Sequence, residues 1–159
     1  MGIDEQQKLA ILNKLQELKG LKIFSQMAER EIFEVMKRSD IISYETGDVV
    51  FHEGNEDEHL YVIIKGLFNV TSTARSGDDL TFFVAGAGLI FGEMSFMDRQ
   101  PRSATITAGE PSEVFCLTRD DFDDLLAKDP TTAAKFMFGV AEILSRRMRG
   151  ANQRIKYAT

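Results

Sequence analysis

The sequence predicts a mainly β protein, a sandwich or barrel of short strands with helices at both ends of the chain. Short runs rich in β-branched and aromatic residues follow one another at the spacing of about 8–12 residues that is typical of all-β domains. No long helical pattern interrupts these runs, which argues against a doubly wound parallel sheet. Apolar residues at helical spacing occur instead before residue 39 and after residue 117.

The first 38 residues carry the pattern of two amphipathic helices. In the first, leucines recur at three-residue spacing: Leu9, Leu12, Leu15 and Leu18. Gly20 ends that pattern, and Ser25 precedes the second helix. The apolar face of the second helix is predicted to consist of Ile32, Phe33 and Met36.

The predicted strands lie within residues 40–117. They are the runs VVFHE before Gly54, LYVIIK before Gly66, FNVTST before Gly77, LTFFVA before Gly86, ATITA before Gly109, and EVFCL. The last run contains Cys116, the only cysteine, which cannot form an internal disulfide. We interpret it as a buried, small apolar residue in a reducing compartment.

Helix returns at Thr118, which is predicted to cap the helix with Asp121 three residues on. Pro130 interrupts it, and a final helix is predicted from about Thr132 to about Arg154. On this helix a 4-3-4-3-4 spacing indicates a coiled-coil seam and a homodimer: Met137, Ala141, Leu144, Met148, Ala151 and Ile155. An adjacent flank is predicted to cover the strands: Phe136, Val140 and Ile143. The alternative is one wide apolar stripe on a helix that only packs on the core.

Length and charge limit the possible functions. The chain of 159 residues suits one domain, and no apolar run reaches the 18 residues typical of a membrane span. The start, MGIDEQQKLAILNK, lacks the features of a signal peptide, so we expect a cytoplasmic protein. The net charge is −6, but residues 132–159 carry six basic residues against one acidic residue. We interpret these charges as a solvated helix face, because the acidic remainder argues against general DNA affinity.

The segment FGEMSFMDRQPRSATI, Phe91–Ile106, places the carboxylate of Glu93 and the guanidinium of Arg102 among mainly apolar and small residues. Gly92 allows the backbone to approach a ligand closely, and a short helix beginning there would direct amide groups at an anion. Arg102 suits phosphate oxygens, and Ser103 adds a hydroxyl donor. Glu93 can only accept hydrogen bonds, so it suits a pair of sugar hydroxyls. The set fits a singly charged phosphodiester that carries a ribose.

These residues resemble the phosphate-binding cassette of cyclic nucleotide-binding domains, which occur in kinase regulatory subunits, gated channels and catabolite-activator-type transcription factors. The resemblance covers roughly residues 20–155. It includes IFSQMAEREI, the opening strands ETGDVVFHEGNEDEHLYVIIKGLFNV with their turn glycines, and the closing helix LSRRMRGANQRI. It implies one domain over residues 1–159: N-terminal helices in 1–38, a β-roll or jelly roll in 40–117 with the cassette at 91–106, and C-terminal helices in 118–155.

The resemblance also implies a role for each residue of the cassette. Glu93 would bind the ribose 2′-hydroxyl, and Arg102 would bind the exocyclic phosphate oxygens. Ser95 stands where the family usually has a smaller residue such as alanine. Alternate residues of 82–84 would wall the base. The full predicted ligand site is Phe91, Gly92, Glu93, Met94, Ser95, Arg102, Ser103 and Ala104.

We therefore expect a cyclic AMP or cyclic GMP sensor that relays binding through its C-terminal helices to an effector protein or a missing output domain. No DNA-binding domain is expected, because no recognition helix follows the last helix. The alternative is a dimeric interaction scaffold whose ligand is lost or incidental. Retention of both Glu93 and Arg102 argues against that alternative, because a buried charge without a partner is strongly penalised. Base preference and affinity stay open, and Asn152 is a conceivable base contact.

A metal-dependent β-barrel enzyme is a weaker alternative. His52 and His59 are the only histidines, and they flank the acidic residues Glu53, Glu56, Asp57 and Glu58. Metal sites need several convergent ligands, so we interpret these acids as a solvated turn. No nucleophile has an evident base, so neither an enzyme nor a metal cofactor is predicted.

Overall fold

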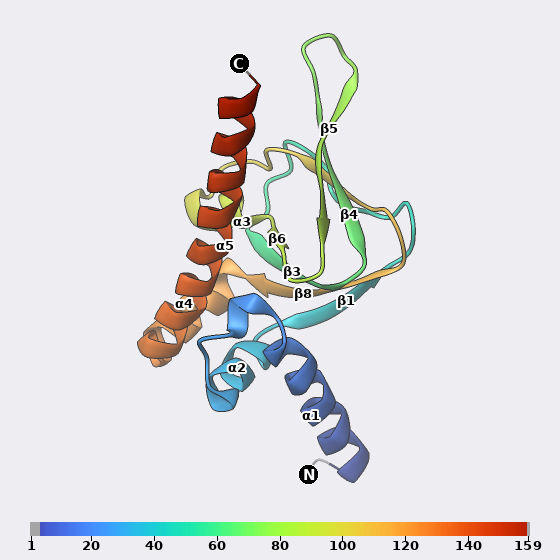
Figure 1. Cartoon of the computed structure of the whole chain (residues 1–159). Coiled ribbons are helices and arrows are strands. Elements are labelled where there is room, and N and C mark those ends of the chain that lie inside the picture. Colours follow the sequence, from blue (N-terminus) through green and yellow to red (C-terminus); the bar gives the residue numbers. More distant parts are fainter. Residues whose placement is uncertain (1–3, 159) are drawn as a thin grey trace.

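The computed structural model describes residues 4–158, which form two four-stranded antiparallel sheets with helices packed at both ends of the chain (Figure 1). The predicted fold class, a β-roll with flanking helices, is confirmed. Residues 1–3 and 159 of the predicted ranges lie outside the described residues. The strands are β1 (Asp40–Tyr44), β2 (Val49–Phe51), β3 (His59–Lys65), β4 (Leu67–Thr73), β5 (Asp79–Gly86), β6 (Ile90–Phe91), β7 (Thr105–Ala108) and β8 (Ser112–Thr118).

One sheet has the order β1-β8-β3-β6 and the other the order β2-β7-β4-β5. Strands β3 and β8 lie in the middle of the first sheet and are buried on both faces. Along β3, Leu60 and Val62 pack with the helices, whereas Tyr61 and Ile63 face the interior of the roll. This explains why LYVIIK is a continuous apolar run rather than an alternating one. Each fully buried large apolar side chain contributes about 1.5–3 kcal/mol.

The helices are α1 (Glu5–Lys19), η1 (Lys22–Phe24, a 3₁₀ turn), α2 (Glu29–Met36), α3 (Glu93–Asp98), α4 (Arg119–Lys128) and α5 (Pro130–Tyr157). The leucine stripe of α1 is buried only in its second half: Leu15 and Leu18 are buried, whereas Leu9 and Leu12 are more than half exposed. The predicted cap of α4 is confirmed, since Thr118 Oγ1 accepts a hydrogen bond from the Asp121 amide. Pro130 begins α5 in the first turn, where its missing N–H costs nothing.

Helix α5 runs along one side of the sheets, and its C-terminal end lies at the same end of the molecule as the β4–β5 hairpin (Figure 1). Its predicted flank of Phe136, Val140 and Ile143 is buried in the core, as expected. Gly139 lies between them, directly against η1. A Cβ on Gly139 would come within 2.2 Å of the Ile23 carbonyl oxygen, so this contact of two backbones requires glycine.

The predicted coiled-coil seam needs a correction. Met137 and Leu144 pack against the helical core, because they lie beside the buried flank. The stripe of α5 that stays exposed is shifted by one residue at both places, and its regular spacing then passes through Asn152 rather than Ala151, which is also exposed. It consists of Phe138, Ala141, Ser145, Met148, Asn152 and Ile155, which still follow a 3-4-3-4-3 spacing.

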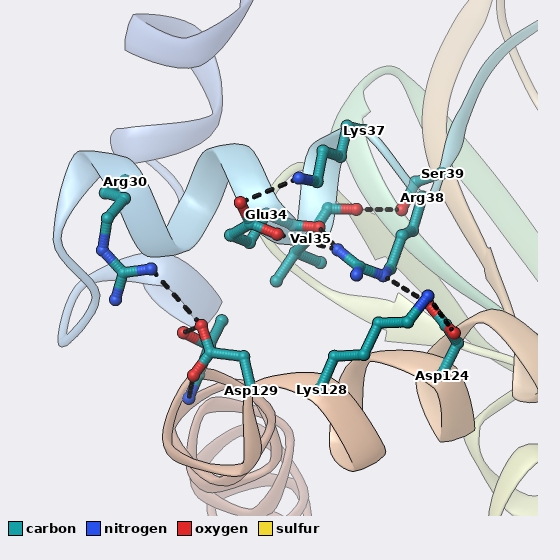
Figure 2. Close-up of polar contacts among 10 residues, drawn as sticks. Arg30, Glu34, Val35, Lys37, Arg38, Ser39, Asp124, Lys128 and Asp129 are labelled. Atoms are coloured by element: carbon teal, nitrogen blue, oxygen red, sulfur yellow. Dashed lines mark hydrogen bonds and ion pairs between the residues drawn. The ribbon is translucent and has the colours of Figure 1, made fainter.

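Charged side chains join α2 to the C-terminal helices. Figure 2 shows Arg38, just after α2, bridging Glu34 of α2 and Asp124 of α4, and Arg30 of α2 reaching Asp129 at the start of α5. Exposed pairs of this kind contribute only about 0–1 kcal/mol each. The Glu31–Lys135 pair between α2 and α5 differs, because Glu31 is buried and its oxygen lies 2.8 Å from Lys135 Nζ.

No helix within residues 4–158 combines the length and the apolar character that a membrane crossing requires.

Candidate functional site

A cavity of about 490 Å³ lies between the cassette, β5 and α5. Its volume is in the range of about 300–1,000 Å³ that is typical of small-molecule sites. Its wall contains seven of the eight predicted site residues: Phe91, Gly92, Glu93, Met94, Ser95, Ser103 and Ala104. The wall also includes Phe51, Val70, Phe82, Phe83, Ile106 and Arg147. The surface is therefore mainly apolar, with a carboxylate, hydroxyls and one guanidinium as polar groups.

Gly92 sets the direction of the cassette. Its φ is +77°, in the left-handed region, and it immediately precedes the short helix α3. A Cβ on Gly92 would lie 2.6 Å from the His59 carbonyl oxygen and 2.7 Å from Arg102 Nη1. Only glycine fits this position, both for its backbone angle and for the close approach.

Glu93 is 8% exposed and lies on the cavity wall. Its Oε1 accepts a hydrogen bond of 2.7 Å from Nη1 of Arg147, a residue of α5. The same guanidinium donates from Nη2 to the Ile90 carbonyl oxygen at 2.6 Å and stacks 5.1 Å from the centre of the Phe83 ring. The acid of the cassette is therefore bound directly to the long C-terminal helix.

Arg102 differs from the prediction. It is 2% exposed, and it is the one predicted residue that does not line the cavity. Its guanidinium forms a two-pronged ion pair with Asp57 and donates to the carbonyl oxygens of Gly92 and His59, both at 2.9 Å. It also lies over the Phe51 ring, 4.0 Å from the centre. Glu93 and Arg102 therefore have separate partners and do not form a pair with each other.

The acidic turn between β2 and β3 also needs a correction. Asp57 does not point into solvent but binds the buried Arg102. Glu58 pairs with Arg99, and Glu53 accepts hydrogen bonds from Ser72 Oγ and the Thr73 amide. The turn therefore holds the cassette and the β4 strand in place.

Sequence reasoning missed the two charged partners of the cassette, Asp57 and Arg147, as well as the apolar wall residues Phe51, Val70 and Ile106. A signal for Arg147 exists, since it continues the buried flank of Phe136, Val140 and Ile143 at 4-3-4 spacing. A charged residue on that face of the helix lies where the helix meets the sheets, so it needs a polar or oppositely charged partner there. No local pattern singles out Asp57 among its acidic neighbours.

The remaining candidates differ in where they lie relative to the cavity. Asn152 is exposed. Of the 82–84 segment, Phe82 and Phe83 both line the cavity, whereas Val84 does not. Within residues 4–158, no three His, Cys, Asp or Glu side chains converge as metal ligands would. Cys116 is buried, and burial raises the pKa of its thiol to about 11.

The helix that begins after Gly92, the carboxylate of Glu93 on the cavity wall and the buried Arg102 behind it together have the features of a small-molecule binding site on a β-roll. A family model of the cyclic nucleotide-binding domain matches residues 41–129. The chain belongs to this family, which confirms the prediction at the level of the family.

Known proteins of this family resemble the chain over most of its length. The cyclic AMP receptor protein of Thermus thermophilus is 30% identical over 85% of this chain and 61% of its own length. The chain thus spans less than two thirds of this curated relative. A cyclic nucleotide-binding domain from Methylobacillus flagellatus superimposes with a TM-score of 0.82 at 27% identity, covering 95% of this chain and 85% of that one. The regulatory domain of Toxoplasma gondii PKA with cAMP gives 0.62 at 26% identity, covering 77% and 46%.

Proposed function

We propose that this chain is a sensor that binds cyclic AMP or cyclic GMP in the cavity beside the cassette. The observation that carries the proposal is the position of Glu93, a nearly buried carboxylate on the wall of a mainly apolar cavity of about 490 Å³. Such a group suits a ligand that is mainly flat and apolar but offers hydroxyl donors. The Thermus relative is named for cyclic AMP, which supports this class of ligand.

In the proposed complex, Glu93 accepts hydrogen bonds from the ribose 2′-hydroxyl. Ser103 and cassette amides donate to the phosphate. Arg102 lies directly behind the cavity wall, hydrogen-bonded to the carbonyl of the lining residue Gly92. We expect the phosphate to attract this guanidinium and to compete with Asp57 for it, because a charge-assisted bidentate contact suits either anion.

The same contacts support a relay to α5. Arg147 holds the Glu93 oxygen that the ribose hydroxyl would approach, so ligand and helix compete for one carboxylate. A ligand shifts an equilibrium only by its differential affinity for two arrangements. Here the difference is the Glu93–Arg147 bond, which exists in one arrangement and is weakened in the other. The change would then pass along α5 to a partner protein or an output domain.

We further propose a homodimer through α5. Phe138, Met148 and Ile155 are 76%, 66% and 68% exposed, and they belong to one stripe. A second copy of the helix would bury this stripe, and Asn152 within it would fix the register of the pair.

One observation favours the scaffold alternative, in which the ligand is lost. Glu93 and Arg102 are each satisfied by a partner within the chain, Arg147 and Asp57. Their retention is therefore no argument for a ligand, because neither charge is buried without a counter-charge.

Isothermal titration calorimetry separates the two functions. We expect wild-type protein to give saturable heat with cyclic AMP or cyclic GMP. The control is Arg38→Ala, which removes an arginine that is ion-paired but remote from the cavity, and it should give the same heat as wild type. Arg102→Ala should weaken binding by about 100-fold or more, because truncating a buried charged partner costs about 2–5 kcal/mol. Circular dichroism checks that the variant is folded. No heat from either nucleotide with wild-type protein would instead favour the scaffold.

A further inference from the structure

A second and larger cavity, of about 700 Å³, lies between the C-terminal half of α5 and the turn after β5. Its floor is apolar and is formed by Phe83, Val84, Leu89, Ile143 and Ala151. Phe83 and Arg147 also line the cassette cavity, so these two side chains form the wall between the two spaces. The site already described does not use this second cavity.

The rim of the second cavity is basic. It carries Lys22, Arg146, Arg147 and Arg154, and no acidic residue lines the cavity. Just outside it, the single carboxylate of Glu142 is shared by Lys22 at 3.8 Å and Arg146 at 3.1 Å. Among the described residues, no ion pair or hydrogen bond engages the side chain of Arg154. The rim therefore has more positive charge than its neighbours neutralise.

We propose that this cavity binds an amphipathic anion, an apolar chain or ring that ends in a carboxylate or a phosphate. The apolar floor stabilises the body of such a ligand by about 25 cal/mol for each Å² removed from water. The rim cations stabilise its head group. The volume suits a compact small molecule rather than a protein segment.

A second nucleotide suits the cavity less well. A ribose needs hydrogen-bond acceptors, and no carboxylate lines this cavity, whereas Glu93 of the cassette cavity lies on the other side of Arg147. The wall of the second cavity offers cations and hydrocarbon, which match a fatty or aromatic acid. This inference does not depend on the proposed nucleotide function.

The test uses the dye 8-anilinonaphthalene-1-sulfonate, an aromatic anion that fluoresces in apolar sites, with decanoate as competitor. We expect one dye per chain, displaced by decanoate at least about tenfold more effectively than by the neutral decanamide. Combining Lys22→Gln with Arg154→Gln should remove most of that preference, because both changes take charge from the rim.

A matched pair of variants locates the binding. Gly150 lines the cavity, and nothing lies within 4 Å of a Cβ placed there. Gly150→Leu should obstruct the space and abolish binding while favouring the helix about fivefold, so the protein should stay folded. Gln153→Leu adds the same side chain outside the cavity and should bind like wild type. Unchanged binding in Gly150→Leu, equal loss in both variants, or equal displacement by decanamide would overturn the proposal.

Discussion

Arg102 is the most completely satisfied charged side chain of the cassette. It is 2% exposed, forms an ion pair with Asp57, donates to two carbonyl oxygens and lies over an aromatic ring. Burying a guanidinium costs several kcal/mol unless its donors are used. Asp57 therefore acts as an internal stand-in for an external anion, and removing it should make Arg102 depend on the phosphate of a ligand.

Asp57→Asn tests this dependence. We expect the free energy of unfolding to fall by about 3 kcal/mol without nucleotide, because a buried charge loses its partner. With saturating cyclic AMP or cyclic GMP, much of the loss should be recovered, so the nucleotide should stabilise the variant more than wild type. Urea unfolding with and without nucleotide measures both quantities.

The matched control for this experiment is Asp123→Asn, which removes a carboxylate that pairs with Arg99 and Arg119 near the surface. It should lower stability by no more than about 1 kcal/mol and leave the effect of nucleotide unchanged. If nucleotide stabilises Asp57→Asn no more than it stabilises wild type, then Asp57 and the phosphate do not compete for Arg102.

The sequence predicted the lining of the cavity better than its ionic contacts. Residues 91–95 and 103–104 lie together because they are local, and Gly92 determines how that segment turns. Asp57 and Arg147 come from a loop and a helix that are distant in sequence. Their roles follow from how α5 and the β2–β3 loop dock on the cassette, which no local pattern contains.

At the scale of elements, the docking of α5 on η1 determines where the long helix points. Gly139 allows the two backbones to touch, and every residue of α5 beyond it, including Arg147, takes its position from that contact. A side chain at residue 139 would push the helix outward.

Gly139→Ala should therefore destabilise the protein by about 1–3 kcal/mol, although alanine favours helix, because its Cβ would overlap the Ile23 carbonyl. Gly150→Ala is the matched control on the same helix, where nothing obstructs a Cβ. It should raise stability by up to about 1 kcal/mol. Thermal unfolding followed by circular dichroism compares the two, and stabilisation by both changes would contradict the close approach of α5 to η1.

The sequence identified six of the eight strands within residues 4–158 and missed β1 and β6. β3, β4, β5 and β8 have seven or eight residues each, which is long enough for a run rich in β-branched and aromatic residues to be recognised. β6 has two residues, too few for any periodicity to appear. β1 lies at the edge of its sheet and is largely exposed, so it lacks an apolar run. The shifted seam of α5 has a similar cause, because only the packing of Met137 and Leu144 decides which of two adjacent stripes is buried.

At the scale of the whole molecule, the N-terminal and C-terminal helices are joined by the pair of Glu31 and Lys135. The hydrogen bond from Lys135 holds the pKa of the Glu31 carboxyl below its ordinary value of 4.5, and the Ala28 amide acts in the same direction. Because the pKa is lower in the folded state, the ionised carboxylate stabilises the fold above about pH 4.5. That contribution is lost as the pH falls through the folded-state pKa.

Glu31→Gln should lower the free energy of unfolding by about 1.5–3 kcal/mol at pH 7, the usual value of a hydrogen bond to a charged group. The difference from wild type should shrink toward zero as the pH falls below 4.5. Urea unfolding at a series of pH values measures it. Glu29→Gln, which removes a half-exposed pair with Lys19, should change stability much less than Glu31→Gln does. A penalty for Glu31→Gln that stays constant with pH would contradict this role of its charge.

Assembly is the other property of the whole molecule. If α5 forms the proposed dimer, Met148→Glu places a charge on the seam of both copies and should raise the dissociation constant by about 30-fold or more, since central apolar contacts are commonly worth about 2 kcal/mol or more. Leu9→Glu makes the same change at an equally exposed leucine of α1 and should have no effect. Sedimentation equilibrium measures the dissociation constant of the dimer for each variant. Equal constants for the two variants would place the interface elsewhere.

The bond between Arg147 and Glu93 has a consequence for the sensitivity of the proposed sensor. The nucleotide concentration at which half of the molecules respond would depend on how firmly residue 147 holds Glu93, and not on the cassette alone. Replacing that one arginine would move the midpoint of the dose–response curve while every phosphate contact stays the same. Two proteins with identical cassettes would then respond at different nucleotide concentrations. The half-response concentration would be determined in part by a residue of α5, outside the cassette.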